Sequence, residues 1–412
     1  MKVKYISVVL GLAFVLTGYP QTRTYTLEEC IEEAVGNNPG LKSSRKKIEV
    51  AQARKGTYLD LPNTGVELSQ ASIEGAGMDN GLTFSQEFDF PTIYVARHNV
   101  LKAEEQLVRQ EYNESLAKCR ADVTSAYYSL LFYTAKAELL RKDMENYTEF
   151  SKISRIRFEA GETSKLECLN AERMLAKMSS MLEETELAAA SGRIKLANAI
   201  GADGPVDIAE NEIYPIDADG ETEEFNLESN YSSRVFDAQL KVNEKNISLA
   251  RHEVLPSFSG SATSQLLLKG FNPYHVERDR FSKGDFMGFS VGVTVPLFFG
   301  AKRSQLITAM REAELAKLRF DDEILRQTAE FDELKNELAQ SRKRLTYYQT
   351  QALGQAAELR NLARISYELG EIDYLEYMQN IENAQEIWIE YFETVERYNQ
   401  ALIKIKTLNG TI

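Results

Sequence analysis

The segment Lys152–Arg173 reads KISRIRFEAGETSKLECLNAER, and the segment Leu362–Asn383 reads LARISYELGEIDYLEYMQNIEN. Each passes from a helix-like pattern through an aromatic residue and a Gly-Glu pair into a second helix-like pattern. A glycine at the end of a helix takes a left-handed conformation without a Cβ penalty, and the acidic or hydroxyl residues that follow it suit a helix N-terminus. We therefore predict a helical-hairpin tip at Gly161 and another at Gly370.

Long proline-free tracts surround both glycines. No proline lies between Pro91 and Pro205, or after Pro296. Both tracts are rich in Ala, Leu, Glu, Lys and Gln, with apolar residues that recur three and four positions apart, which indicates helices with an apolar seam. Because proline would break such helices, we predict two long helical hairpins, over residues 92–199 and 300–408.

Alternating segments precede both helical tracts. In the stretch Leu82–Phe90 apolar residues alternate with polar ones, with Gln86 as the exception on the apolar side, and Met287–Leu297 alternates in the same way. This period of two is typical of strands that have one apolar and one polar face. Together with the runs that precede them across a loop, these stretches predict β-hairpins over residues 64–90 and 257–297.

The same order of elements therefore occurs twice: a short helix, a β-hairpin and a long helical hairpin. We assign the first structural repeat to residues 22–205 and the second to residues 206–412. The predicted fold class is mainly α with a small β part, built from this duplicated unit. Residues 1–21 combine a charged start with an apolar run shorter than the about 20 residues that cross a bilayer, which is typical of a secretory signal peptide. A buried N-terminal helix is the alternative interpretation.

Composition excludes several classes of protein. The net charge of −14 is opposite in sign to what nucleic-acid binding requires. The three cysteines and three histidines follow no metal-ligand or disulfide spacing, and the cysteines fit small buried side chains or chance thiols. No nucleophile, metal-hydrolase or phosphate-loop motif occurs. We therefore predict no enzyme activity, no catalytic residues, no cofactor, no metal site and no nucleic-acid partner.

Two interpretations of the strands stay open at this point. If their apolar faces contact lipid, four strands are too few to close a barrel, and a bilayer does not tolerate an open sheet edge, so the chain must oligomerise. Alternatively, the strands form a small soluble sheet packed against helices. The chain would then be an exported coiled-coil structural or adhesion protein without a pore, although such a protein would not need the second β-hairpin.

The chain resembles the TolC-like outer membrane efflux proteins, the outer membrane factors of tripartite efflux systems. The resemblance begins at Tyr25–Arg45, YTLEECIEEAVGNNPGLKSSR, and continues through both β-hairpins and both glycine turns to about Leu408. It implies a homotrimer that builds a twelve-stranded outer membrane β-barrel, continued by an α-helical tunnel in the periplasm. It also implies three kinds of contact outside the trimer: a periplasmic adaptor (membrane fusion) protein, an inner-membrane transporter and outer membrane lipid.

By the same resemblance, Gly161 and Gly370 lie at the periplasmic tip, where the tunnel is closed. Glu167 matches an acidic position of the gate, and Tyr367 matches a tyrosine that helps to hold the gate closed. Glu376 matches an acidic position that lines the constriction. The alternative for both glutamates is a solvated helix face, which is the commonest environment of this residue type.

One position of the tip departs from the family pattern. The residue two after Gly370 is basic in the best-known member but is Ile372 here, so we expect closure by packing and hydrogen bonding instead of a salt bridge. Three inward carboxylates at a narrow tip would attract cations and raise one another's pKa. On the polar strand face, Glu87 and Asp89 are candidates for the barrel lumen, with a place at the periplasmic rim or in a loop as the alternative.

The segment Phe84–Val100, FSQEFDFPTIYVARHNV, is similar to outer membrane partners of heavy-metal resistance-nodulation-division pumps. The expected function is therefore that of a passive conduit in a tripartite efflux pump, with heavy-metal ions as a candidate cargo. The duct itself shows no ladder of Cys, Met and His for soft metals, so selectivity would belong to the pump and the adaptor. Tyr94, Phe298 and Phe299 fit an aromatic girdle at the membrane surface or, alternatively, core packing.

Overall fold

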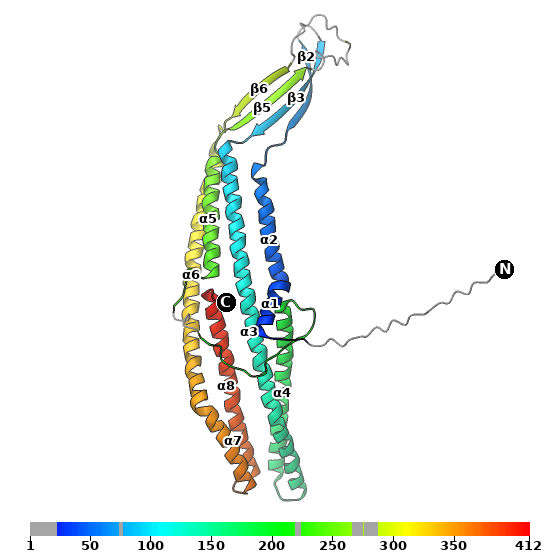
Figure 1. Ribbon diagram of the computed structural model, residues 1–412, viewed down its shortest axis with the longest axis vertical. Coiled ribbons are helices and arrows are strands. Elements are labelled where there is room, and N and C mark those ends of the chain that lie inside the picture. The colour runs from blue at the N-terminus through cyan, green and yellow to red at the C-terminus, as the bar shows by residue number, and fades with distance from the viewer. Residues whose placement is uncertain (1–22, 74–76, 219–223, 266–274, 276–286) are drawn as a thin grey trace, which may run out of the picture. The chain divides into compact units, whose positions relative to one another are not determined.

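The computed structural model describes residues 23–73, 77–218, 224–265, 275 and 287–412, so the predicted signal peptide lies outside the described residues. The chain is mainly helical with a small strand content, as predicted (Figure 1). It divides into two compact units. Among the described residues, the tip unit comprises those within 23–38, 122–215 and 343–399, and the sheet unit comprises those within 39–121, 216–342 and 400–412. Each unit draws on both halves of the sequence, and the division into repeats 22–205 and 206–412 stays a prediction.

The sheet unit contains one four-stranded antiparallel sheet. Its strands are β2 (Gly65–Ile73), β3 (Gly77–Phe88), β5 (Ser257–Gln265) and β6 (Met287–Thr294), in the order β2-β3-β5-β6 (Figure 1). All four lie within the ranges predicted for the β-hairpins. The pairing of β3 with β5 joins the two hairpins, so strands that are distant in sequence form one surface.

The alternation of side chains gives this sheet two different faces. Residues directly opposite one another on paired strands lie on the same face. The apolar face carries rows of mainly apolar side chains, for example Val66, Phe84, Ala262 and Phe289. The hydroxyl face carries short polar side chains, for example the row Ser85, Ser261 and Ser290.

The stretch Leu82–Phe90, predicted as strand, extends too far at its end, because β3 stops at Phe88. The backbone groups that follow bond to the start of α3 (Pro91–Glu159) instead of to another strand. The Asp89 N–H donates to the Tyr94 hydroxyl at 2.8 Å, and the Phe90 carbonyl accepts from the Ile93 N–H at 2.8 Å. Asp89 therefore lies at the junction of sheet and helix, not on the hydroxyl face.

The sheet unit also contains several helices. They are α2 (Pro39–Lys55), a 3-10 turn (Gly56–Leu59), α5 (Tyr231–His252), the start of α3 and the start of α6 (Gly300–Tyr347). Glu105 of α3 joins two of them, since its almost fully buried carboxylate accepts from Lys55 Nζ at 2.7 Å and from Arg109 Nη2 at 2.8 Å. The hydrogen bonds from Lys55 and then Arg109 lower the pKa of Glu105 to about 2. Among the described residues, no helix is both long and apolar enough to cross a bilayer.

The tip unit is built from helices. It holds the remainder of α3, most of α8 (Tyr374–Leu408), and α1 (Leu27–Asn37), α4 (Lys165–Ile200) and α7 (Leu353–Glu368), with a short parallel pair of strands, β1 (Arg23–Tyr25) and β4 (Val206–Ile208). α1 begins at Thr26, which forms a capping box with Glu29. A π-helical turn, Tyr348–Ala352, interrupts the tract that was predicted as one helix.

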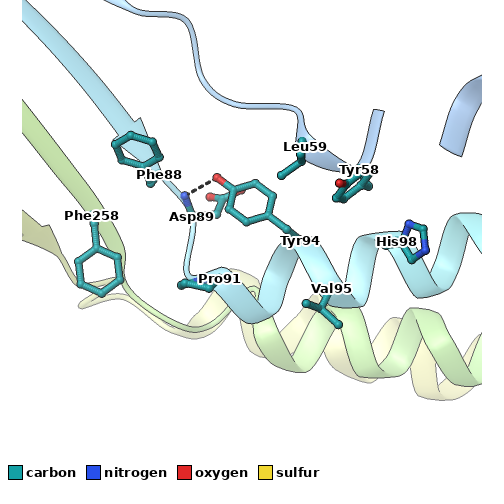
Figure 2. A pocket seen from close by; sticks show the side chains of 9 residues that line it. All are labelled: Tyr58, Leu59, Phe88, Asp89, Pro91, Tyr94, Val95, His98 and Phe258. Carbon is teal, nitrogen blue, oxygen red and sulfur yellow. Dashed lines mark hydrogen bonds between the residues drawn. The ribbon is translucent and has the colours of Figure 1, made fainter. Parts of the chain in front are cut away.

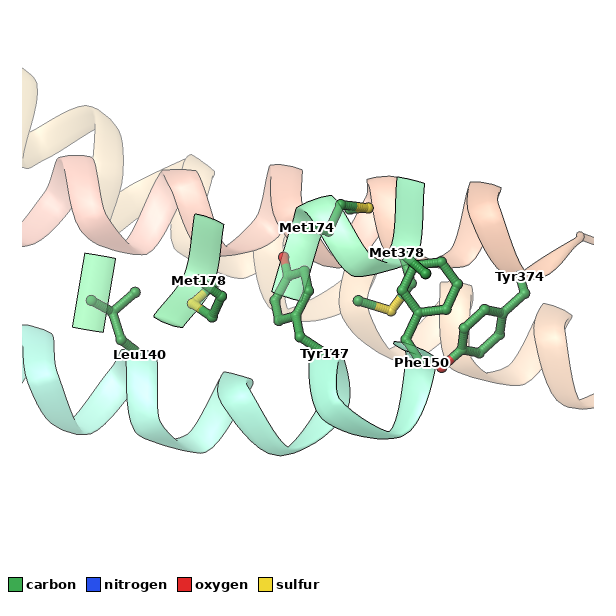
Figure 3. Close-up of a cluster of buried hydrophobic side chains, with 8 residues drawn as sticks. Leu140, Tyr147, Phe150, Met174, Met178, Tyr374 and Met378 are labelled. Atoms are coloured by element: carbon green, nitrogen blue, oxygen red, sulfur yellow. The ribbon is translucent and has the colours of Figure 1, made fainter. Parts of the chain in front are cut away.

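A cluster of buried side chains joins the two helical hairpins within the tip unit (Figure 3). Its members come from α3, α4 and α8 and are Leu140, Tyr147, Phe150, Ala171, Met174, Met178, Tyr374 and Met378. The rings of Phe150 and Tyr374 lie 4.2 Å apart between centroids. Because aromatic rings and methionines bury large apolar areas, this cluster contributes hydrophobic attraction between the hairpins.

Two left-handed glycines of the tip unit differ in their surroundings. Gly161 has φ +78 and nothing within 4 Å of the place that a Cβ would take, whereas Gly201 has φ +72 and a Cβ there would lie 2.9 Å from the Asn37 carbonyl oxygen. We expect Gly161→Ala to lower the free energy of unfolding by about 1 to 2 kcal/mol through backbone strain. Gly201→Ala should cost about 2 to 4 kcal/mol, because overpacking adds to the strain. Denaturant titration of both variants in detergent measures the difference, and equal losses would contradict the prediction.

The Glu105 site predicts a pH dependence. Because its pKa is lower in the folded chain than the ordinary value of 4.5, its contribution to stability is complete above about pH 4.5 and disappears as the pH falls toward 2. Glu105→Gln should lower the free energy of unfolding by about 2 to 3 kcal/mol at pH 7, the usual range for hydrogen bonds to charged groups. The difference between wild type and variant in thermal unfolding should shrink below about pH 4.5 and be lost only near pH 2. The control is Glu49→Gln, which removes an exposed pair with Lys46 and should cost under about 1 kcal/mol.

Candidate functional site

The first predicted tip lies between α3 and α4. Gly161 adopts φ 78°, and the chain reverses through backbone bonds from Gly161 N–H to the Phe158 carbonyl at 3.0 Å and from Glu162 N–H to the Arg157 carbonyl at 2.8 Å. The hydroxyl of Ser164 then accepts from the Glu167 N–H at 3.2 Å and caps α4. The glycine and the capping hydroxyl together allow the helix to stop and restart within a few residues.

The second tip, between α7 and α8, repeats this geometry. Gly370 adopts φ 74°, its N–H donates to the Tyr367 carbonyl at 3.0 Å, and the Glu371 N–H donates to the Ser366 carbonyl at 2.8 Å. The carboxylate of Asp373 accepts from the Glu376 N–H at 2.8 Å. The two tips of the predicted gate are therefore built alike from different residue types.

Glu167 interacts within its own tip. The Thr163 hydroxyl donates to its carboxylate, and Arg157 Nη1 lies 3.9 Å from it. Glu376 occupies the matching position of the second tip, and its side chain is exposed. No hydrogen bond or ion pair joins these two carboxylates within the described part of the chain. Ile372, where the family pattern has a basic residue, is half-buried.

Tyr367 lies in an aromatic group that the sequence did not reveal. Its ring stacks on Tyr377 at 5.1 Å with an interplanar angle of 18°, and it lies 4.9 Å from the ring of Tyr374. Tyr374 in turn contacts Phe150 of α3, so Tyr367 is connected through two rings to the other hairpin. Burial raises the pKa of both Tyr374 and Tyr377, which keeps these phenols neutral. The repeated tyrosines of the segment Tyr367–Tyr377 were the available signal.

A buried ion pair lies in the same unit and was also missed. Asp143 of α3 is fully buried, and its carboxylate oxygens lie 3.0 Å from Arg360 Nη1 and 3.1 Å from Arg360 Nη2 on α7. Burial raises the pKa of Asp143, and the positive charge of Arg360 offsets part of that effect. Nearby, Tyr147 donates to Gln385 Oε1 at 3.3 Å, and Lys177 lies 2.7 Å from Glu382. The hairpins are thus joined by polar as well as apolar contacts.

The two predicted lumen residues have different environments. Glu87 lies in β3 opposite Ser259, on the hydroxyl face, and its side chain is exposed. Asp89 accepts from Arg97 Nη2 at 3.2 Å and is half-buried at the start of α3. Glu87 therefore lies on the polar face of the sheet, and its place in a barrel lumen stays a prediction, whereas Asp89 is held by a local ion pair.

The apolar face of the sheet is exposed in the single chain. Phe289 and Val291 of β6 retain 76% and 86% of their accessible surface, and Val66, Leu68 and Phe84 are exposed as well. Contiguous apolar patches of this kind mark contact with a partner or a membrane. On the hydroxyl face, side chains of neighbouring strands bond to each other: the Ser261 and Ser290 hydroxyls lie 2.8 Å apart, and the Thr83 and Thr263 hydroxyls lie 3.0 Å apart.

The Asp143–Arg360 pair predicts an order of stabilities. Arg360→Met leaves a buried charge without its partner, whereas Asp143→Asn leaves an arginine whose side chain is 35% exposed. We expect Arg360→Met to cost about 3 to 5 kcal/mol of unfolding free energy at pH 7.5 and Asp143→Asn less, about 2 kcal/mol.

The same variants have a pH signature. Because the pKa of Asp143 is raised in the folded chain, protonation favours the fold, so the deficit of Arg360→Met should shrink as the pH falls toward 5. Denaturant titration at both pH values measures this, with Lys177→Met, which breaks an exposed pair, as the control. A larger loss for Asp143→Asn than for Arg360→Met would contradict the assignment.

Comparison with known proteins agrees with these features. The profile of the outer membrane efflux protein family matches residues 30–202 and 227–411, whereas no curated protein matches the chain.

Three solved structures illustrate the likeness in fold. The CmeC outer membrane channel of Campylobacter jejuni has 15% identity and a TM-score of 0.74, with 100% of this chain and 94% of that chain covered. The open-state MtrE outer membrane channel of Neisseria gonorrhoeae has 15% identity and a TM-score of 0.72, with 93% and 88% covered. CusC, studied for folding and transmembrane channel formation, has 16% identity and a TM-score of 0.73, with 94% and 93% covered.

These structures share the fold of helical hairpins and a small sheet, and the family match extends over most of the chain in two segments that contain both β-hairpins and both tips. The chain belongs to the outer membrane efflux protein family.

Proposed function

We propose that this protein is the passive exit duct of a tripartite efflux pump and that it works as a homotrimer in the outer membrane. One observation carries the proposal: a four-stranded sheet with an exposed apolar face, an opposite hydroxyl face and two outer edges. The family consists of outer membrane efflux proteins, not of enzymes.

The apolar face supports contact with lipid. Its rows of aromatic and β-branched side chains are too exposed for a sheet that packs against the protein's own helices, as Phe289 and Val291 illustrate. A strand in a bilayer needs apolar side chains on its outer face and tolerates polar ones only toward a lumen. The hydroxyl face, including Glu87, would therefore line the water-filled side.

The outer edges of the sheet support assembly. β2 and β6 each pair with one strand among the described residues, and hydrocarbon cannot replace the missing hydrogen-bond partners. Copies of the chain can satisfy one another when β2 of one chain pairs with β6 of the next. Three chains would then contribute twelve strands, the number that the family resemblance implies.

The tips support a gate that closes by packing. Ile372 removes the basic residue of the family pattern, and Glu167 already interacts with Thr163 and Arg157 in its own tip. The stacked ring of Tyr367 would hold α7 against α8 in the closed state. Glu376, with its exposed carboxylate, remains available to line the constriction and to favour cations.

The partners proposed for the duct are a periplasmic adaptor at the tips and an inner-membrane transporter. We assign the transporter to the resistance-nodulation-division class, and heavy-metal ions as its cargo, on the similarity of the segment Phe84–Val100 to partners of such pumps. The net charge of −14 is compatible with a conduit for cations.

Single-channel conductance in planar bilayers, paired with the oligomer mass in detergent, tests the proposal. We expect a trimer with a small, cation-selective conductance. The combined substitution Glu167→Gln with Tyr367→Ala should raise the conductance several-fold, because it removes the stacking and the carboxylate contacts of the tips.

The matched control is Tyr347→Ala, which removes an exposed tyrosine from α6 at a distance from the tips in sequence. It should leave the conductance unchanged. A monomer without conductance would contradict the duct and favour a structural protein without a pore. A trimer whose conductance does not respond to the tip variant would retain the duct but contradict the position of the gate.

A further inference from the structure

A pocket of about 670 Å³ lies at the start of α3, where the sheet meets the helices (Figure 2). It is lined mainly by apolar and aromatic side chains, among them Tyr58, Leu59, Phe88, Tyr94, Val95 and Phe258. The 3-10 turn Gly56–Leu59, the first turns of α3 and the ends of β3 and β5 supply these residues. Its volume is in the usual range of sites for small ligands.

The pocket is continuous with the apolar face of the sheet. Phe88 and Phe258 lie directly opposite each other on β3 and β5, and Val293 of β6 lies opposite Phe258 in the same row. Phe88 and Phe258 also line the pocket. A chain of methylene groups lying along this row could therefore pass into the pocket without leaving an apolar surface.

The pocket is open on one side. Leu59 and Val95 retain 52% and 61% of their accessible surface although both line it. Exposed apolar residues that line a concave surface indicate a ligand or a partner more strongly than scattered ones do.

One end of the pocket offers polar atoms. The ring of His98 packs edge-on against Tyr58, with centroids 5.1 Å apart, and His98 Nδ1 is buried without a hydrogen-bond partner among the described residues. The Asp89 carboxylate, which also lines the pocket, accepts from Arg97, and the Asp89 backbone N–H donates to the Tyr94 hydroxyl. The polar end is therefore formed by an imidazole and a phenol, which can bond to a neutral or anionic oxygen.

We propose that this pocket binds one acyl chain of an outer membrane phospholipid, with the polar part of the lipid beside Tyr58 and His98. The inference rests on the proposed contact of the apolar face with lipid, since that contact brings acyl chains to the row Phe88, Phe258 and Val293. A bound lipid would fill the junction at which the sheet changes into the helices.

Fluorescence quenching by brominated lipids tests the pocket. The chain has one tryptophan, so Trp388→Phe provides a background to which single reporters are added. Leu59→Trp reports the pocket, Val291→Trp the apolar face, and Gln52→Trp an exposed site on α2. In phosphatidylethanolamine vesicles brominated on the acyl chains, the first two reporters should be quenched and the third should not.

The reporters separate two kinds of failure. If Val291→Trp is quenched and Leu59→Trp is not, the inference that the pocket binds lipid is wrong, while the proposed function stands. If neither is quenched, the contact of the sheet with lipid fails, and the inference fails with it.

Native mass spectrometry of the full chain in detergent supplies a second measurement. We expect one retained phospholipid per chain in the wild type. Val95→Glu should reduce retention by about tenfold or more, because a carboxylate in an apolar site costs more than the free energy of one tenfold step. The matched control is Val50→Glu, a similarly exposed valine of α2 that does not line this pocket. Equal retention in both variants, or a wild type without lipid because a second copy covers the pocket, would overturn the inference.

Discussion

A sheet that lies in hydrocarbon must find a hydrogen-bond partner for every backbone N–H and C=O, because the lipid offers none. In this chain the inner strands β3 and β5 meet that requirement on both sides, whereas β2 and β6 each have one strand partner among the described residues. The proposed assembly follows from this difference, because β2 and β6 each need a second strand partner. In that proposal, neighbouring chains complete the two outer edges of the sheet.

At the tips the constraint is different, since helices satisfy their own backbone groups except at their ends. Gly161 and Gly370 allow the chain to reverse direction between two helices, and neither lies in a sterically crowded position. What remains is to hold two hairpins side by side, and for this the chain combines a buried aromatic and methionine cluster with the Asp143–Arg360 pair. The cluster contributes hydrophobic attraction, whereas the net contribution of a buried ion pair is small, because the cost of desolvating both charges offsets much of their Coulomb attraction.

Much of this fold could be predicted from the sequence, because burial acts directly on residue type. Alternating apolar and polar residues indicated the strands, proline-free tracts with an apolar seam indicated the helices, and two glycines marked the tips. The cysteines Cys30, Cys119 and Cys168 are buried, which is one of the two environments predicted for them. The end of β3 and the π-helical turn were not predicted, because both depend on which of several nearby acceptors a backbone N–H bonds to. The Asp89 N–H, for example, donates to the Tyr94 hydroxyl and not to a neighbouring strand.

The site was less predictable than the fold. The resemblance indicated Glu167 and Tyr367, but not that Thr163 and Arg157 engage the first or that Tyr374 and Tyr377 surround the second. Asp143 and Arg360 are separated by 217 positions, and no local pattern connects residues that far apart. The contact between them depends on how the helices pack, which cannot be read from a single sequence.

The short side chains of the hydroxyl face limit the interactions that this face can make with a solute. Rows of Ser and Thr, such as Ser85 with Ser261 and Thr83 with Thr263, are too short to form a cleft around a solute. They exchange hydrogen bonds with water and provide neither stacking nor a hydrophobic hold. In the proposed duct such a wall would leave discrimination between solutes to its few charged positions, Glu87 on this face and Glu376 at the second tip, so the interior would sort solutes by charge and not by shape.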